Sequence, residues 1–174
     1  NNNSAVIINH QASVYGMNDV THLGFFDIPM LTSIPNLVYL APTNNEELLA
    51  MTEYAVHQHE HPVAIRVPIG EFISTGVADT TDYSLLNKYE VTRRGEGIAL
   101  LGLGNFYHLA NQVADELAKV GINATVVNPK FASGLDEELL KDLKVNHSVV
   151  FTLEDGVVEG GWGQRVASFY GPSA

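Results

Sequence analysis

The first part of the chain alternates short apolar runs with one amphipathic stretch. Three runs rich in β-branched residues predict strands, over residues 5–10, 37–42 and 63–68. Between the last two runs, residues 43–58 carry apolar positions at helical spacing, with Thr43 as the expected N-cap. A strand, a helix and a strand in this order form a βαβ unit, so we expect a parallel sheet in which residues 5–10 are a buried strand.

A polar stretch separates this pattern from a second one. Residues 70–87 are rich in Gly, Thr, Ser and Asp and show no clear period, which is typical of a connecting segment. We therefore expect two domains, over residues 1–75 and 91–174, joined by a linker over residues 76–90.

Beyond the linker, strand-like and helix-like segments alternate again. Apolar runs predict three strands, over residues 97–104, 123–129 and 148–155. Helical spacing and stop signals predict three helices, over residues 105–121, 135–144 and 164–170. The pattern predicts an α/β protein made of two three-layer α/β/α domains with largely parallel sheets.

The charge balance restricts the class of partner. The 174 residues include 9 Lys and Arg against 20 Asp and Glu, a net charge of −11, whereas nucleic acids and anionic membranes select basic surfaces. We therefore expect no nucleic-acid and no membrane partner. The sequence has no cysteine, no apolar run long enough for a membrane span and no signal-peptide pattern, so we expect a cytoplasmic protein without disulfides or thiolate metal sites.

Two motifs suggest ligands but have simpler interpretations. The run HQHEH at 57–61 stands at the end of a predicted helix and lacks an HExxH pattern, which favours a surface turn over a metal site. The run GLGNF at 102–106 has two of the three glycines of a dinucleotide fingerprint, and Asn128 stands where an acidic residue would end the next strand. A tight turn explains this run, although a helix N-terminus also favours an anion.

Ionisable residues follow two predicted strands, at the edge where α/β sheets place their sites. Glu154 and Asp155 precede a glycine-rich loop, where we expect an interface or regulatory element more than chemistry. His22 follows the first strand, near Asp27 and two phenylalanines that can exclude water. Because an imidazole titrates near neutral pH, His22 is the candidate catalytic residue, with a buried structural histidine as the alternative.

Several stretches resemble a known family. Residues 21–51, THLGFFDIPMLTSIPNLVYLAPTNNEELLAM, resemble the T-H-x-G-x-F-D…I-P-N segment of the 1-deoxy-D-xylulose-5-phosphate synthase family, in the transketolase-like, thiamine-diphosphate-dependent group. AIRVPIG at 64–70 is similar to the family's A-x-R-Y-P-R-G, and FTLEDGVVEGGWGQRV at 151–166 resembles its C-terminal domain. Transketolase and the β-subunits of 2-oxo acid dehydrogenases share the C-terminal signature and are the alternatives within this class.

The resemblance implies a fragment of a longer transferase. It makes residues 1–75 the latter part of a pyrimidine-binding domain and residues 91–174 most of a transketolase C-terminal-like domain. The family decarboxylates pyruvate and joins the product to an aldehyde, glyceraldehyde 3-phosphate, in isoprenoid and thiamine precursor synthesis, with thiamine diphosphate and Mg²⁺ as cofactors. Because the family's G-D-G…N motif is missing here, we expect this fragment to bind neither cofactor alone. We expect a homodimer or association with the missing part; a non-catalytic assembly or regulatory module is the alternative from another class.

The resemblance also assigns site residues. The family histidine that matches His22 lines the active site, which implies catalysis at His22. The family has phosphate-binding arginines at the positions of Gln11 and Ile69, and an aspartate near the histidine is here Asn18. We expect these three positions to line the substrate site. Glutamine offers only a neutral hydrogen bond and isoleucine none, so the phosphate of an acceptor would be held weakly.

Overall fold

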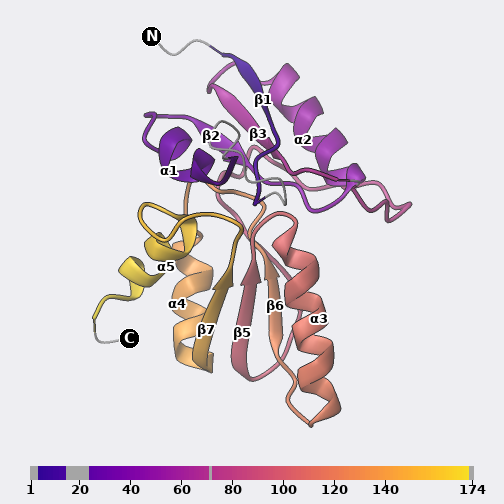
Figure 1. Ribbon diagram of the computed structural model, residues 1–174, viewed down its shortest axis with the longest axis vertical. Helices are drawn as coiled ribbons and strands as arrows, with labels where there is room; N and C mark the ends of the chain where they lie inside the picture. Colours follow the sequence, from indigo (N-terminus) through magenta and orange to yellow (C-terminus); the bar gives the residue numbers. More distant parts are fainter. Residues whose placement is uncertain (1–3, 15–23, 71, 173–174) are drawn as a thin grey trace.

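The computed structural model describes residues 4–14, 24–70 and 72–172, which form two α/β units stacked end to end (Figure 1). One unit is built on a three-stranded sheet, here called sheet A, and the other on a four-stranded sheet, called sheet B. The predicted α/β class with largely parallel sheets is confirmed. No helix in the described part of the chain is long and apolar enough to cross a membrane.

Sheet A is parallel throughout and has the strand order β1-β3-β2. Its strands are β1 (Val6–His10), β2 (Val38–Leu40) and β3 (Val63–Val67). Successive side chains of a strand face opposite sides of the sheet. Ile65 therefore packs toward α2 (Asn45–His57), while Ala64 and Arg66 face α1 (Asp27–Thr32) and sheet B.

The first strand is exposed, so the prediction of a buried strand is wrong. Among the described residues β1 pairs only with β3, and it forms an edge of sheet A. Its side chains Val6, Ile7 and Ile8 are 42%, 41% and 51% exposed. Pairing partners, and not composition, decide which apolar strand stands at an edge. Three adjacent exposed apolar residues at a sheet edge indicate a surface prone to association.

The N-cap of α2 is Asn44, so the prediction of Thr43 is wrong by one residue. The Asn44 side chain accepts the backbone N–H of Glu47 at 2.8 Å. Thr43 instead donates its backbone N–H and its hydroxyl to the Glu47 carboxylate, at 2.7 and 2.9 Å. Both residue types are good N-caps, so local sequence does not separate them, whereas the interaction with Glu47 does.

Sheet B has the strand order β4-β6-β5-β7. The strands β5 (Gly97–Gly102), β6 (Thr125–Asn128) and β7 (His147–Leu153) are parallel, as predicted. The edge strand β4 (Glu90–Arg93) is antiparallel to β6 and makes the sheet mixed. The sequence does not predict β4, because its residues EVTR include one apolar position and adjoin the polar segment.

Helices cover both faces of sheet B, which gives the predicted three layers. Helix α3 (Phe106–Lys119) lies on one face, and α4 (Glu137–Asn146) and α5 (Trp162–Tyr170) lie on the other (Figure 1). Helical spacing predicts that Leu109, Val113, Leu117 and Val120 form the packed face of α3. In the structure Val113 and Leu117 pack on the sheet beside the buried Ala110 and Ala114. Leu109 and Val120 are 41% and 72% exposed, so the prediction is wrong for these two positions.

The two units share one hydrophobic core at their contact, which we call the seam. The carboxyl ends of β5, β6 and β7 point toward sheet A (Figure 1). One cluster of buried apolar side chains extends across the seam, from Tyr39 in the first unit to Trp162 in the second. Leu40 and Phe131 form an antiparallel bridge between the end of β2 and the segment after β6. The domain boundaries given above stay a prediction.

Candidate functional site

The two described positions that the sequence selects for substrate binding lie at the same edge of sheet A. Gln11 directly follows β1 and Ile69 lies two residues beyond β3; these strands are parallel neighbours, with His10 opposite Val67. The backbone N–H of Ile69 donates to the Ser13 hydroxyl at 3.4 Å. Parallel α/β sheets bind ligands at this edge. The carboxyl end of sheet A is therefore the candidate site, and substrate contact by Gln11 and Ile69 stays a prediction.

Gly24, two residues after the candidate catalytic residue His22, contacts the backbone that follows β1. His22 and Asn18 lie outside the described residues, so their roles stay predictions. Gly24 begins the short 3-10 helix η1 (Gly24–Phe26) and lies directly against the backbone after β1. A Cβ atom on Gly24 would stand 1.8 Å from the carbonyl oxygen of Gln11, so only glycine fits there. His22 is therefore two residues away from a backbone contact with Gln11.

A buried ion cluster centred on Arg66 lies at the seam. The guanidinium donates from Nε to Asp27 Oδ2 at 2.6 Å and from Nη2 to Asp27 Oδ1 at 3.2 Å, a two-pronged pair. It also donates from Nη1 to the carboxylate of Asp155 and from Nη2 to the carbonyl oxygen of that residue at 3.0 Å. Arg66, Asp27 and Asp155 are 2%, 4% and 3% exposed. The cluster connects β3, the start of α1 and the end of β7.

Neutral donors complete the cluster. The Tyr39 hydroxyl donates to Asp27 Oδ2 at 2.5 Å, and the Asn105 side-chain amide donates to Asp155 Oδ2 at 3.1 Å. Two carboxylates share one guanidinium, so the cluster carries a net charge of −1 that these neutral donors stabilise. The other side-chain atom of Asn105, Oδ1, is buried and has no partner in the described structure.

The surroundings of Arg66 and Tyr39 raise the pKa of both side chains. Burial disfavours the charged form of Arg66, but the carboxylates of Asp27 and Asp155 outweigh it and raise the pKa of the guanidinium. Burial, together with the charge of Asp27, raises the pKa of Tyr39. Arg66 is thus a permanent cation whose guanidinium is committed to the carboxylates of Asp27 and Asp155.

A second buried cation, Lys130, lies elsewhere on the seam. Its Nζ is 3.2 Å from Glu47 Oε1, 3.0 Å from Glu90 Oε2 and 2.8 Å from the Thr81 hydroxyl. These partners come from α2, from β4 and from the predicted linker. Burial opposes the charge of Lys130, and the nearby carboxylates, Glu47 first, raise its pKa above the usual value. The linker segment therefore lies in polar contact with both units.

The residues that follow the parallel strands of sheet B all contact the first unit or its cluster. Asn105 follows β5, Lys130 follows β6 and Asp155 follows β7. The GLGNF turn is part of this contact, since a Cβ on Gly104 would lie 3.5 Å from the Cβ of Ala41. The residues at the carboxyl edge of sheet B therefore form part of the contact between the two units. This agrees with the expectation that Asp155 belongs to an interface.

The histidine run forms no metal centre in the part of the chain that the structure describes. Among those residues, no group of three His, Asp or Glu side chains is placed to hold a metal ion. The Nδ1 atom of His57 lies 2.8 Å from the carbonyl oxygen of Glu53. His57, His59 and His61 line an open hollow of about 410 Å³ together with Tyr54. His57 and His59 are exposed, at the end of α2 and in the turn before β3.

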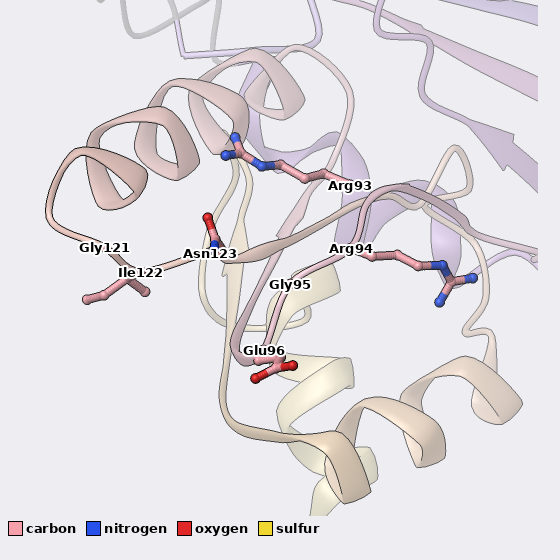
Figure 2. A pocket seen from close by; sticks show the side chains of 7 residues that line it. All are labelled: Arg93, Arg94, Gly95, Glu96, Gly121, Ile122 and Asn123. Atoms are coloured by element: carbon pink, nitrogen blue, oxygen red, sulfur yellow. The ribbon is translucent and has the colours of Figure 1, made fainter.

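A hollow of about 660 Å³ lies at the opposite end of sheet B, around the turn between β4 and β5. Figure 2 shows that Arg93 and Arg94 point to opposite sides of this turn. Arg93 is paired with Asp115 at 2.8 Å. The two guanidinium groups therefore do not converge on one ligand position, and this hollow is not the candidate site.

The sequence analysis missed the roles of Arg66 and Lys130. A usable signal exists for Arg66, because an arginine inside the apolar strand VAIRV must be buried and so needs a carboxylate partner. The identity of that partner depends on tertiary structure, because Asp155 lies 89 residues away. Lys130 gives no such signal, since it stands in a loop sequence where an exposed lysine is the ordinary expectation.

Comparison with known proteins agrees with the resemblance seen in the sequence. The family described as "Transketolase, C-terminal domain" matches residues 87–172. The 1-deoxy-D-xylulose-5-phosphate synthase of Acaryochloris marina is 38% identical over 157 residues, which are 90% of this chain and 25% of that protein. The synthase of Acidobacterium capsulatum is 39% identical over 151 residues, 87% of this chain and 24% of that protein. The chain thus spans about a quarter of the length of these relatives.

A solved structure has the same fold. It is described as a split-gene transketolase in an inactive β4 tetramer, and it aligns with a TM-score of 0.73 at 24% identity, over 95% of this chain and 51% of that one. Residues 87–172 therefore match the transketolase C-terminal domain family, and the chain as a whole is similar in sequence to 1-deoxy-D-xylulose-5-phosphate synthases.

Proposed function

We propose that this chain is part of a thiamine-diphosphate-dependent transferase that decarboxylates pyruvate and joins the resulting two-carbon unit to an aldehyde. The observation that carries the proposal is an identity of 33% to 39% to 1-deoxy-D-xylulose-5-phosphate synthases along about nine tenths of the chain. Because the chain spans about a quarter of those proteins, the reaction is assigned to a longer parent.

His22 is the proposed proton donor of the joining step. Addition of a carbon nucleophile to an aldehyde turns the carbonyl oxygen into an alkoxide, which must gain a proton. An imidazole with a pKa near neutrality is suited to give that proton. The close contact between Gly24 and Gln11 supports this assignment, because it holds one end of the His22 segment at the carboxyl edge of sheet A.

The described residues do not fit the diphosphate and Mg²⁺ of the cofactor. Residues 4–14, 24–70 and 72–172 contain no cluster of three His, Cys, Asp or Glu side chains placed to hold a metal ion. The turns after the parallel strands of sheet B are occupied by seam contacts. We therefore propose that another part of the parent holds both groups, and we derive no step through them.

This chain alone is proposed to be inactive and to associate, either as a dimer or with the rest of the parent. The structural neighbour is described as inactive when its β chain forms a tetramer. The exposed apolar edge of β1 supports association. Sedimentation at micromolar concentration is expected to show a species larger than the monomer, and calorimetry with thiamine diphosphate and Mg²⁺ is expected to show no micromolar binding. A clean monomer would contradict the first expectation, and saturable micromolar binding the second.

The activity is tested in the full-length parent. Pyruvate-dependent carboligation is measured with glyceraldehyde, in the wild type and in His22→Ala. Loss of a general acid is expected to lower kcat by about 10²- to 10⁴-fold. The control is His59→Ala, which changes an exposed histidine in the surface turn and should leave kcat unchanged. A His22→Ala enzyme with wild-type kcat would overturn the assignment of His22, and a parent without carboligation would overturn the proposed function.

A further inference from the structure

Arg66 connects the segment next to His22 with the far end of the chain. Its two-pronged pair holds Asp27, the first residue of α1 and the fifth residue after His22. Its other hydrogen bonds hold the side chain and the backbone of Asp155, in the second unit. Every partner is buried, so water does not weaken these contacts.

The chemistry of the cluster indicates orientation more than stability. Removing an arginine and two carboxylates from water is costly, and well-packed apolar side chains often hold two surfaces together equally well. The seam already has such an apolar contact, which includes Tyr39 and Trp162. A guanidinium differs from an apolar contact in that its planar, two-pronged hydrogen bonding fixes both the distance and the angle of a bound carboxylate.

The cluster is also larger than a simple ion pair requires. Asp155 uses both carboxylate oxygens, one toward Arg66 and one toward the Asn105 amide. Asp27 uses both of its own, with Tyr39 as an additional donor. Neither aspartate can rotate without breaking more than one hydrogen bond. The start of α1 is therefore held relative to the ends of both β5 and β7.

We propose that Arg66 is a positioning residue through which the second unit fixes the segment that follows His22. In this arrangement the second unit fixes the start of α1 from across the seam, because Asp155 fixes the orientation of Arg66 and Arg66 fixes that of Asp27. The importance of this segment for catalysis rests on the proposed function. The connection between Asp155, Arg66 and Asp27 does not rest on the proposed function, since it can be measured without any enzymatic activity.

The test is hydrogen–deuterium exchange of this chain, followed by mass spectrometry of its peptides. In Asp155→Ala, peptides covering residues 24–36 should exchange about tenfold or more faster, although the mutated residue lies in the other unit. Peptides from α3 should change by less than about twofold. Lys141→Met is the control, because it removes a cation that pairs with Glu137 on the surface; it should leave residues 24–36 near the wild-type rate.

Conservative variants separate positioning from simple charge balance. Arg66→Lys keeps the positive charge but cannot form the two-pronged hydrogen bond. Residues 24–36 should therefore exchange nearly as fast in Arg66→Lys as in Arg66→Met. Asp155→Asn keeps an acceptor oxygen for Arg66 and should recover part of the protection lost in Asp155→Ala. Wild-type exchange of residues 24–36 in Asp155→Ala would overturn the proposal. Full recovery in Arg66→Lys would also overturn it, as would equal acceleration of all peptides in the folded Asp155→Asn variant.

Discussion

Lys130 Nζ lies 3.2 Å from Glu47 Oε1 across the seam, with the two side chains only 3% and 5% exposed. Lys130 also has a backbone φ of 60°, in the left-handed region that non-glycine residues rarely adopt. Such a conformation persists where surrounding contacts hold it. The ion pair and the hydrogen bond to Thr81 are the contacts that do so here.

Lys130→Met is expected to destabilise the chain by about 3–5 kcal/mol, because it leaves the Glu47 carboxylate buried without its cation. Urea unfolding followed by circular dichroism measures the free energy of unfolding. The control is Lys141→Met, since Lys141 pairs with Glu137 on the surface, where both side chains are more than half exposed. That change should cost less than about 1 kcal/mol. Equal losses of unfolding free energy in the two variants would show that the buried ion pair contributes no more to stability than the surface pair.

Glu154 gives a pH-dependent prediction. Its carboxylate accepts the backbone N–H groups of Trp162 and Gly163, both at 3.0 Å, at the start of α5. Burial raises the pKa of Glu154 and outweighs these hydrogen bonds, which lower it. The folded state therefore favours the protonated form. The stability that this form contributes is complete below the unfolded pKa and is lost as pH rises through the folded pKa.

Glu154→Gln removes this titration, so the comparison isolates it. The free energy of unfolding of the wild type minus that of Glu154→Gln is expected to decrease as the pH rises above the ordinary glutamate pKa of about 4.3. Urea unfolding of both proteins at several pH values measures the difference. A difference that increases with pH would mean that the hydrogen bonds dominate and that the pKa of Glu154 is lowered.

The sequence predicts a strand or helix well where the local pattern of apolar residues alone is enough to identify it. The strands β3, β5 and β6 are recognisable because they are continuous apolar runs, and α3 is recognisable because its apolar stripe recurs at helical spacing. Features that depend on neighbours are not predictable in this way. The exposure of β1 depends on which strands flank it, and β4 forms only because β6 offers an edge.

The candidate site also has one part that the sequence predicts and one part that it does not. The order of the strands lets the sequence place Gln11 and Ile69 at equivalent strand ends, and the structure does bring these positions to one edge of sheet A. The Arg66 cluster is different, because it joins Asp27 to Asp155 across 128 residues of sequence, the sum of the 39- and 89-residue separations from Arg66. No local pattern encodes a partner at such a distance.

Gly24→Ala is expected to destabilise the chain by about 1–3 kcal/mol, because the new Cβ would overlap the carbonyl oxygen of Gln11 and force the backbone to shift. Thermal or urea unfolding measures the loss. Gly156→Ala is the matched control at the seam: its Cβ would meet Ile28 at 3.6 Å, an ordinary contact, so a small change is expected. A Gly24→Ala variant as stable as the wild type would contradict the claim that only glycine fits against the carbonyl oxygen of Gln11.

The substrate prediction concerns the charge that the site lacks. The resemblance seen in the sequence implies arginines at the positions of Gln11 and Ile69, and this stays a prediction. Arg66 is committed to Asp27 and Asp155. A phosphate group entering this edge of sheet A would lose water without gaining a charged partner from either position. The full-length parent is therefore expected to use glyceraldehyde 3-phosphate no better than unphosphorylated glyceraldehyde.

Restoring the charge should reverse this preference. In the parent, Gln11→Arg combined with Ile69→Arg is expected to raise kcat/KM for glyceraldehyde 3-phosphate by about 10- to 100-fold, since a hydrogen bond to a charged group contributes about 1.5–3 kcal/mol. The gain should appear mainly in KM, because the phosphate is held equally in the ground state and the transition state. Gln112→Arg, on the exposed side of α3, controls for added charge alone and should change neither parameter. Steady-state kinetics with both aldehydes tests this prediction. Efficient use of the phosphorylated acceptor by the unmodified parent would mean that another group binds the phosphate.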